Sequence, residues 1–163
     1  MLPMVGVGVD VHPYADPELG RELALACLTW PGENGLAGHS DADVLLHAIT
    51  DALLGAAALG DIGMHFPDTD PQWKGAQSDV FLKHAAALVR DRGYGIVNVD
   101  STVIAERPKL KDYRTPIRER VAAVMEIELD RVSLKFKTSE RVGPVGEGRS
   151  VEAHAVVTIS RTG

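Results

Sequence analysis

Residues 39–54, HSDADVLLHAITDALL, contain the helix on which we expect the fold to be built. Apolar residues recur in this stretch at the spacing of one helical face, which predicts a buried helix ending near Gly60. That face consists of Val44, Leu45, Ile49, Leu53 and Leu54. Ser40 is a favourable N-cap with Asp43 in a capping-box-like position, and the carboxylates of Asp41 and Asp43 complement the helix dipole.

Valines alternate with Gly6, Gly8, Asp10 and His12 near the start of the chain, which is the period of a β-strand. Side chains two apart on a strand share a face, so Asp10 and His12 can reach one ion together. We expect His47, on the helix, to be the third ligand. Three protein ligands leave one position open around zinc, which is the arrangement of catalytic rather than structural sites.

The imidazole of His47 has a second nitrogen that needs a partner if the first binds a metal. Asp43 and Asp51 lie four residues away on either side, so either carboxylate can hold that nitrogen. Two alternatives to a metal site remain open from these residues. One is a surface carboxylate beside an ordinary histidine, and the other is a capped helix with a solvated acidic flank.

The composition narrows the class of protein. With 163 residues and 45% hydrophobic content, we expect a single domain over residues 1–163. A net charge of -6 argues against nonspecific nucleic-acid binding. Cys27 is the one cysteine, so we expect no intrachain disulfide, a reducing compartment and an inert thiol. No secretion signal or membrane-length apolar stretch is visible, and we expect a soluble, cytoplasmic protein without a membrane partner.

Further elements are predicted from periodicity and turn residues. Besides the first strand, extended segments are expected over residues 23–30, 96–105, 132–138 and 151–159. Two more helices are expected to begin at Ser78 and at Thr115-Pro116, and to end near Gly93 and Leu129. Five strands and three helices in mixed order predict an α/β two-layer sandwich, a mixed sheet with helices on one face. The other face is left uncovered in so short a chain, so we expect oligomerisation.

Residues 60–71 form a segment rich in acidic and turn residues. The stretch Asp61-Ile62-Gly63 can present backbone N–H groups to an anion, because glycine permits close approach. Asp68 and Asp70 can orient hydroxyl groups or bind a hard cation. The alternative is an ordinary acidic loop, since loops are generally polar.

Two other motifs follow predicted strands. Thr138-Ser139-Glu140-Arg141 offers two hydroxyls, a carboxylate suited to Mg²⁺ or Mn²⁺ and a guanidinium suited to phosphate. Residues 105–110 contain Pro108, which fixes a local turn whose backbone groups can read a flat base edge. The alternative for both motifs is strand-end chemistry without a ligand.

Together these motifs resemble the 2-C-methyl-D-erythritol 2,4-cyclodiphosphate synthase family of the non-mevalonate isoprenoid pathway. The resemblance covers nearly the whole chain, and its strongest element is residues 39–51. The other motifs fall in the expected order as GDIG at 60–63, FPDTD at 66–70, RPK at 107–109 and TSE at 138–140. The resemblance implies a homotrimer with active sites between subunits. It also implies conversion of 4-diphosphocytidyl-2-C-methyl-D-erythritol 2-phosphate to the cyclic diphosphate, with release of CMP.

The resemblance also implies roles for single residues. Asp10, His12 and His47 match zinc ligands, and Glu140 matches the ligand of Mg²⁺ or Mn²⁺. His39 and Thr138 match catalytic positions that stabilise the transition state. Positions matching substrate contacts outside the cytidine pocket are Asp10, Val11, His12, His39, Ser40, Asp61, Ile62, Gly63, Phe66, Pro67, Asp68, Thr69, Asp70, Lys137, Thr138, Ser139 and Glu140. Those matching the cytidine pocket are Ala105, Glu106, Arg107, Pro108, Lys109, Leu110 and Lys111.

One segment departs from the family pattern. Relatives often carry a longer glycine-rich stretch, with an aromatic and an arginine, where this chain has GPVGEG at residues 143–148. Pro144 stands where the aromatic is usual. The family arginine is implicated in phosphate binding near the trimer axis, and Arg141 and Arg149 are the candidates to replace it.

Two other classes of function compete with this interpretation. Two histidines and one carboxylate can hold non-haem Fe(II) in an oxygenase, although such sites usually lie on all-β scaffolds. A nonenzymatic module could instead bind a nucleotide or a metal without turnover. Metal analysis separates the first alternative from a zinc enzyme, and a CMP-release assay separates the second.

Overall fold

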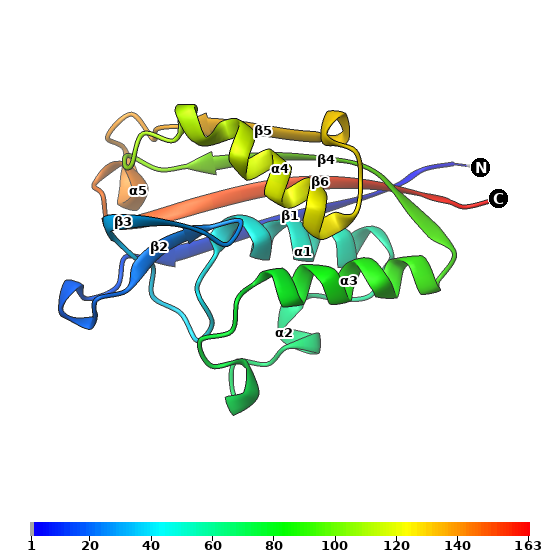
Figure 1. Cartoon of the computed structure of the whole chain (residues 1–163), viewed down its shortest axis with the longest axis horizontal. Coiled ribbons are helices and arrows are strands. Elements are labelled where there is room, and N and C mark those ends of the chain that lie inside the picture. Colours follow the sequence, from blue (N-terminus) through cyan, green and yellow to red (C-terminus); the bar gives the residue numbers. More distant parts are fainter. Residues whose placement is uncertain (1) are drawn as a thin grey trace.

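A four-stranded mixed sheet in the order β1-β6-β4-β5 forms one layer of the computed structural model, which describes residues 2–163 (Figure 1). The strands are β1 (Met4–Pro13), β4 (Tyr94–Ile104), β5 (Val132–Lys137) and β6 (Ser150–Arg161). Strand β6 runs antiparallel to both β1 and β4, whereas β5 runs parallel to β4. Strands β1, β4 and β5 therefore all end at the same edge of the sheet.

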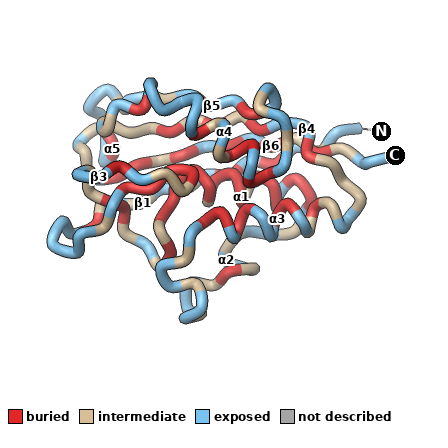
Figure 2. Tube along the Cα trace, in the orientation of Figure 1, coloured by how far each residue is buried: buried red, intermediate tan, exposed pale blue. Residues whose placement is uncertain are grey.

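Helices α1 (Val44–Ala56), α3 (Asp79–Asp91) and α4 (Arg114–Met125) form the second layer on one face of the sheet (Figure 1). Helix α1 is the most deeply buried of them (Figure 2). Short helices occupy the connections: α2 (Ile62–His65), α5 (Gly143–Gly146) and the 3₁₀ turns Pro17–Leu19, Pro71–Trp73, Lys111–Tyr113 and Leu129–Arg131. The predicted two-layer α/β architecture with a mixed sheet is confirmed.

Helix α1 lies directly on the backbone of β1 because the inward side of that strand begins with glycines. A Cβ atom on Gly6 would lie 2.0 Å from the carbonyl oxygen of Ala52, and one on Gly8 would lie 1.9 Å from that of Ala48. Neither position has room for a side chain. The inward side of β1 then continues into Asp10 and His12, which places these two residues next to α1.

The outward side of β1 is a row of exposed valines. Val5, Val7, Val9 and Val11 retain 59%, 65%, 48% and 50% of their exposure. Val156 on β6 pairs with Val7 in register and is also exposed. An apolar stripe of this kind usually marks an interaction surface. The predicted uncovered sheet face is therefore present in the isolated chain.

The structure corrects the segment predicted as one strand over residues 23–30. It is a hairpin of β2 (Glu22–Leu25) and β3 (Leu28–Asn34), so residues 2–163 contain six named strands rather than five. Its turn residues Ala26 and Cys27 have φ of 52° and 58°. Two consecutive left-handed residues form the turn that suits the twist of a hairpin.

Four helix boundaries also differ from the prediction. Helix α4 begins at Arg114, with Tyr113 as its N-cap, rather than after Thr115. Helix α1 begins at Val44, not just after Ser40, because Ala42 has a φ of 56° and Asp43 is the N-cap that accepts the N–H of Leu46. It ends at Ala56, before Gly60, and α2 lies within the segment expected to be a loop. Helix α4 ends at Met125 because Glu126 adopts a left-handed conformation.

Among residues 2–163, we find no helix with both the length and the apolar character needed to cross a membrane. Cys27 is half-buried in the turn of the β2–β3 hairpin. Burial, together with the nearby Asp43 carboxylate, raises the pKa of its thiol to about 11. A thiol with so high a pKa is a poor nucleophile at neutral pH, as predicted.

Candidate active site

Asp10, His12 and His47 converge where the end of β1 meets the first turn of α1. Oδ2 of Asp10 lies 2.8 Å from Nε2 of His12 and 3.1 Å from Nδ1 of His47. The two histidine nitrogens are 3.2 Å apart. These residues come from elements that are 35 positions apart in sequence, and the structure brings them together as the spacing predicted.

The hydrogen bonds around this cluster leave electron pairs pointing inward. Nδ1 of His12 lies 2.8 Å from the carbonyl oxygen of Ala37, so it must carry the proton, and neutral His12 presents a lone pair at Nε2. Nε2 of His47 faces hydroxyl oxygens of Ser78 at 2.8 Å and Ser40 at 3.2 Å. Three donor atoms gathered in this way, with the outer nitrogens held, fit a metal ion.

The partner of the outer nitrogen of His47 was not predicted correctly. Neither Asp43 nor Asp51 reaches it, since these carboxylates accept backbone N–H groups. Asp43 accepts those of Cys27 and Leu46, and Asp51 accepts that of Ile62 at 2.7 Å. The ring of His47 instead points toward Ser78 at the start of α3.

Electrostatics also suit a cation at this point. Burial of Asp10 opposes its ionisation, but its side-chain contacts with the imidazoles of His12 and His47, and their positive charge when a proton occupies the cluster, outweigh that effect and lower its pKa to about 2. Burial of His12 disfavours its charged form, but the hydrogen bond and charge of Asp10 outweigh it and raise the pKa of the imidazole. Without a metal, the cluster thus tends to hold a proton in the place of a cation.

A pocket of about 430 Å³ opens beside the three donors. The predicted residues that line it are Asp10, His12, His39, Ser40, His47, Ile62, Gly63, Phe66, Pro67 and Asp68. Eight of the substrate-contact residues predicted outside the cytidine pocket are absent from this lining: Val11, Asp61, Thr69, Asp70, Lys137, Thr138, Ser139 and Glu140. Val11 is excluded because it lies on the outward side of β1.

The acidic residues of the loop mainly shape the backbone. Asp61 is the N-cap of α2 and accepts the N–H of Met64, while the side chain of Asp70 accepts the N–H of Gln72. The carbonyl oxygen of Asp70 lies 3.0 Å from Nε2 of His39 and fixes that ring. The N–H of Ile62, expected to face an anion, is taken by Asp51.

His39 and Ser40 do not stand at a helix start as predicted. They lie in the loop before the N-cap Asp43, and the hydroxyl of Ser40 contacts His47 and accepts the N–H of Ala42. Arg21 donates to the carbonyl oxygens of Gly38 and Ser40, at 2.8 and 2.6 Å. The loop is therefore held from outside the pocket while His39 and Ser40 face into it.

An aromatic floor, consisting of Phe66, Trp73 and Phe81, lines the same pocket. The ring centroid of Phe66 lies 4.6 Å from that of Phe81 and 5.2 Å from that of Trp73. The ring centroids of Phe81 and His47 are 6.0 Å apart. Trp73 and Phe81 were missed as pocket residues. Phe81 has the helical spacing of a core residue, and no motif surrounds Trp73, so nothing in the sequence separated them from ordinary packing.

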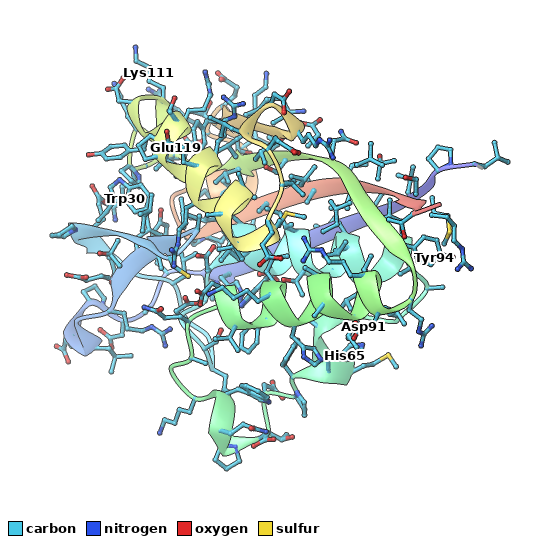
Figure 3. The ribbon with its side chains drawn as sticks, turned by 45° about the vertical axis from the view of Figure 1, so that its right-hand side comes forward. Trp30, His65, Asp91, Tyr94, Lys111 and Glu119 are labelled. Atoms are coloured by element: carbon cyan, nitrogen blue, oxygen red, sulfur yellow. The ribbon has the colours of Figure 1, made fainter. Side chains whose placement is uncertain are left out.

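A second pocket, of about 280 Å³, lies where β4 and β5 end. The predicted residues that line it are Ala105, Glu106, Pro108, Lys109, Leu110, Lys111, Lys137 and Thr138. Lys111 lies at the periphery of the molecule (Figure 3). The predicted cytidine positions therefore gather in one place, with one exception described next.

Arg107 lies outside this second pocket. Its guanidinium lies over the ring of Tyr14, 5.6 Å from the centroid, and its carbonyl oxygen accepts the hydroxyl of Tyr14. Oε1 of Glu106 accepts the N–H of Ser139, which joins the two loops. Oε1 of Glu140 accepts the hydroxyl of Thr138 at 2.8 Å. Glu140 is exposed and separate from the Asp10 cluster.

The shortened glycine-rich segment forms α5 and a turn into β6. Of the two candidate arginines, Arg149 pairs with Glu147 at 2.7 Å, and Arg141 is exposed with a φ of 64°. The pairing of Arg149 with a carboxylate makes Arg141 the freer of the two for binding an anion.

A two-layer α/β fold with three potential metal donors beside an open pocket is the arrangement of a protein with a candidate catalytic metal site. The model of the YgbB family matches residues 4–160, and the chain belongs to that family. It is 65% identical over 156 residues to the 2-C-methyl-D-erythritol 2,4-cyclodiphosphate synthase of Solibacter usitatus (strain Ellin6076), covering 96% of each chain. The recognised resemblance is thereby confirmed.

Two solved structures agree with this assignment. A 2C-methyl-D-erythritol-2,4-cyclodiphosphate synthase in a CDP-bound form has a TM-score of 0.86 and 41% identity, over 96% of this chain and 99% of that one. The Plasmodium falciparum IspF complex with CDP has a TM-score of 0.86 and 31% identity, over 99% and 97%. Because both identities exceed 30% over nearly the whole chain, the likeness to these structures concerns the family as well as the fold.

Proposed function

We propose that this protein converts 4-diphosphocytidyl-2-C-methyl-D-erythritol 2-phosphate to 2-C-methyl-D-erythritol 2,4-cyclodiphosphate and CMP, in isoprenoid precursor biosynthesis. The observation that carries the proposal is the Asp10, His12 and His47 cluster at the mouth of a pocket, in a chain of this family. We further propose a cytoplasmic location, because a single cysteine suits a reducing compartment.

Asp10, His12 and His47 would hold zinc, and Glu140 would hold Mg²⁺ or Mn²⁺. The nitrogen-rich set suits zinc, whereas a lone exposed carboxylate suits a hard cation that keeps its other positions for water and phosphate. When bound, these ions supply Lewis-acid neutralisation of phosphate charge. We assign the enzyme to the phosphorus–oxygen lyases on the bond that it breaks.

The reaction joins two anionic groups of one molecule. An oxygen of the 2-phosphate attacks the β-phosphorus, a new P–O bond closes the ring, and the bond between the β-phosphorus and the oxygen bridging to the α-phosphorus breaks. CMP leaves with that bridging oxygen. The main requirements on the protein are in-line positioning and neutralisation of negative charge. No protein nucleophile is needed, which agrees with the high pKa of Cys27.

The chain's own groups can meet these requirements. His39 and Ser40 face the pocket next to the three donors, and the hydroxyl of Ser40 is placed to donate to a phosphate oxygen. The aromatic floor of Phe66, Trp73 and Phe81 suits the apolar carbon skeleton of methylerythritol. Thr138 lines the second pocket and would stabilise the transition state from the other side.

The second pocket suits the cytidine. Its backbone groups at residues 105–110 can bind the base edge, and structures similar to this chain are described as bound to CDP. Lys109, Lys111 and Lys137 add positive charge for the nucleotide.

The active unit we propose is a homotrimer with sites between subunits. Within residues 2–163 the two pockets share no lining residue, so one chain offers two separate half-sites. The exposed valines of β1 give an apolar surface on which further copies can pack. A native mass corresponding to one chain would contradict the trimer.

The deciding experiment is incubation of the purified protein with the authentic substrate, Zn²⁺ and Mg²⁺, followed by phosphorus NMR. We expect CMP and a cyclic diphosphate to appear together. Binding of CDP without turnover would instead favour a nucleotide-binding module. Iron as the bound metal, with no CMP formed, would favour an Fe(II) enzyme.

A further inference from the structure

Ser78 occupies the N-cap position of α3, but its hydroxyl is not used as a cap. Ser78 is fully buried, and its Oγ lies 2.8 Å from Nε2 of His47 and in hydrogen-bond contact with Oδ1 of Asp41. The hydroxyl is directed to these two side chains instead of the N–H groups of its own helix. A serine at this position normally stabilises the helix by capping, so its different use here calls for a reason.

The direction of these hydrogen bonds follows from the chemistry of the groups. A carboxylate can only accept, so the single proton of the Ser78 hydroxyl goes to Asp41. The oxygen of Ser78 can then only accept from His47, which requires the proton of the ring to be on Nε2. Oδ2 of Asp10 lies 3.1 Å from Nδ1 of His47 and is the competing acceptor, so a neutral ring that donates to Ser78 keeps a lone pair at Nδ1, at the place where a cation would lie between the two groups.

Asp41 is itself fixed, so the chain of hydrogen bonds has one direction. Its carboxylate also accepts the N–H of Asp43 at 3.1 Å and that of Ser78 at 3.0 Å. Its own N–H donates to the carbonyl oxygen of Ala76 at 3.0 Å. With the carboxylate held by two backbone N–H groups, the Ser78 hydroxyl has a constant acceptor.

We propose that Asp41 and Ser78 are positioning residues of the metal centre, which set the tautomer and the ring orientation of His47. Asp41 orients the hydroxyl of Ser78, Ser78 accepts the proton of Nε2, and His47 thereby presents Nδ1 to the ion. Partners of this kind raise the affinity of a metal site without touching the metal. The inference rests on the proposed metal centre for its consequence, but the tautomer is a property of the metal-free protein.

The first test is the tautomer of His47 in the metal-free wild-type protein, read from imidazole ¹⁵N chemical shifts at a pH where the ring is neutral. We expect the form protonated at Nε2. A ring protonated mainly at Nδ1 would overturn the proposal. This measurement needs no variant and no activity.

The second test compares zinc affinity by chelator competition. Ser78→Ala removes the nearer of the two hydroxyl acceptors and leaves only Ser40 at 3.2 Å, and we expect zinc affinity to fall about 10–100-fold. Asp41→Asn removes the charge that orients the hydroxyl, and we expect a smaller loss of about 10-fold together with a mixed tautomer. Ser78→Thr keeps a hydroxyl and should restore most of the affinity lost in Ser78→Ala, even if it lowers thermal stability.

Asp79→Asn is the matched control. Asp79 is the next residue along, is similarly buried, and bonds Lys83 and Arg120 rather than His47. We expect it to lower stability while leaving zinc affinity within about twofold of wild type, because it lies outside the hydrogen-bond chain. Wild-type affinity in both Ser78→Ala and Asp41→Asn would overturn the proposal. If the wild-type protein bound no zinc, the proposed metal centre would fail, while the tautomer measurement would still decide the hydrogen-bond direction.

Discussion

The two pockets lie at the same edge of the sheet but differ in how firmly their polar groups are held. Around the metal centre, Asp10, His12 and His47 contact one another, and both histidines have a partner for the outer nitrogen. Around the second pocket, Thr138 and Glu140 are exposed and bond mainly each other. One chain therefore preorganises the proposed metal ligands by itself, whereas the pocket proposed for the nucleotide is open and, in our proposal, becomes complete against another subunit.

The largest effect is expected from a variant of the more firmly held pocket, which contains Asp10, His12 and His47. His47→Ala removes one of three ligands from a site that already leaves one position open, so zinc occupancy and nearly all activity should be lost, by about 1,000-fold or more. The fold should survive, because packing of α1 rests on its apolar face. Metal analysis and circular dichroism of the purified variant check this. Full zinc occupancy in the variant would remove His47 from the ligand set.

A smaller effect on activity is expected from a variant near the second pocket, where the polar groups are exposed. Glu140→Gln keeps the shape of the side chain but removes the charge that attracts a hard cation, so cyclisation should slow by about 10–100-fold. The requirement for Mg²⁺ or Mn²⁺ should weaken, and zinc content should stay at the wild-type level. Loss of zinc together with activity would show that Glu140 belongs to the first metal site.

A mixture of the His47→Ala and Glu140→Gln variants tests whether the two halves of the proposed active site come from different chains. After dissociation and reassembly of an equal mixture, about one interface in four should pair an intact zinc side with an intact Glu140 side. Activity should rise well above the sum of the two parents. If subunit exchange is proven by mass spectrometry and activity stays at that sum, each active site is built within a single chain.

The smallest effect is expected from pH. Zinc needs neutral His12, whose pKa is raised by Asp10, so zinc affinity should fall as pH drops through that raised pKa, by up to about tenfold per unit for each proton displaced. Asp10, with a pKa of about 2, stays ionised throughout this pH range and does not add to the pH dependence of zinc affinity. Titrations between pH 5.5 and 8 check this, and a flat affinity would contradict it.

The metal-free protein should respond to pH in the opposite direction. A folded pKa that is raised means that the folded state holds its proton more firmly, so this contribution to stability is present below the unfolded pKa and lost as pH rises. His12 acts in this way, and so does buried Asp43, whose pKa is raised to about 7 by burial and by Asp41. The melting temperature without metal should therefore fall from pH 6 to 8, as zinc affinity rises.

Local pattern was enough to predict which three residues gather at the proposed metal centre. Asp10 and His12 follow from strand alternation, and His47 follows from a strongly periodic helix. The β2–β3 hairpin was missed because its turn uses Ala26 and Cys27, which lack the usual glycine or asparagine signal for left-handed backbone. The start of α1 was misplaced because Ser40, Asp41 and Asp43 are all good caps, and only tertiary contacts decide which one serves.

Contacts between distant segments were beyond any local pattern. Ser78 looks like a helix cap in sequence, but it is 31 residues from His47, and only packing of α3 against α1 brings the two together. Trp73 and Phe81 join the pocket for the same reason. Asp61 and Asp70 differ from their expected roles because their carboxylates accept backbone N–H groups of nearby residues.

The glycines of β1 limit how this centre can change during evolution. Gly8 has no ligand atom, yet a methyl group there would push against the backbone of α1 at Ala48, the residue next to His47. Moving the helix outward would carry one ligand away from the other two, which are anchored on the strand. The spacing between helix and sheet therefore sets the distance between the ligands of the proposed metal centre, and Gly8 must stay without a side chain for the three donors to meet.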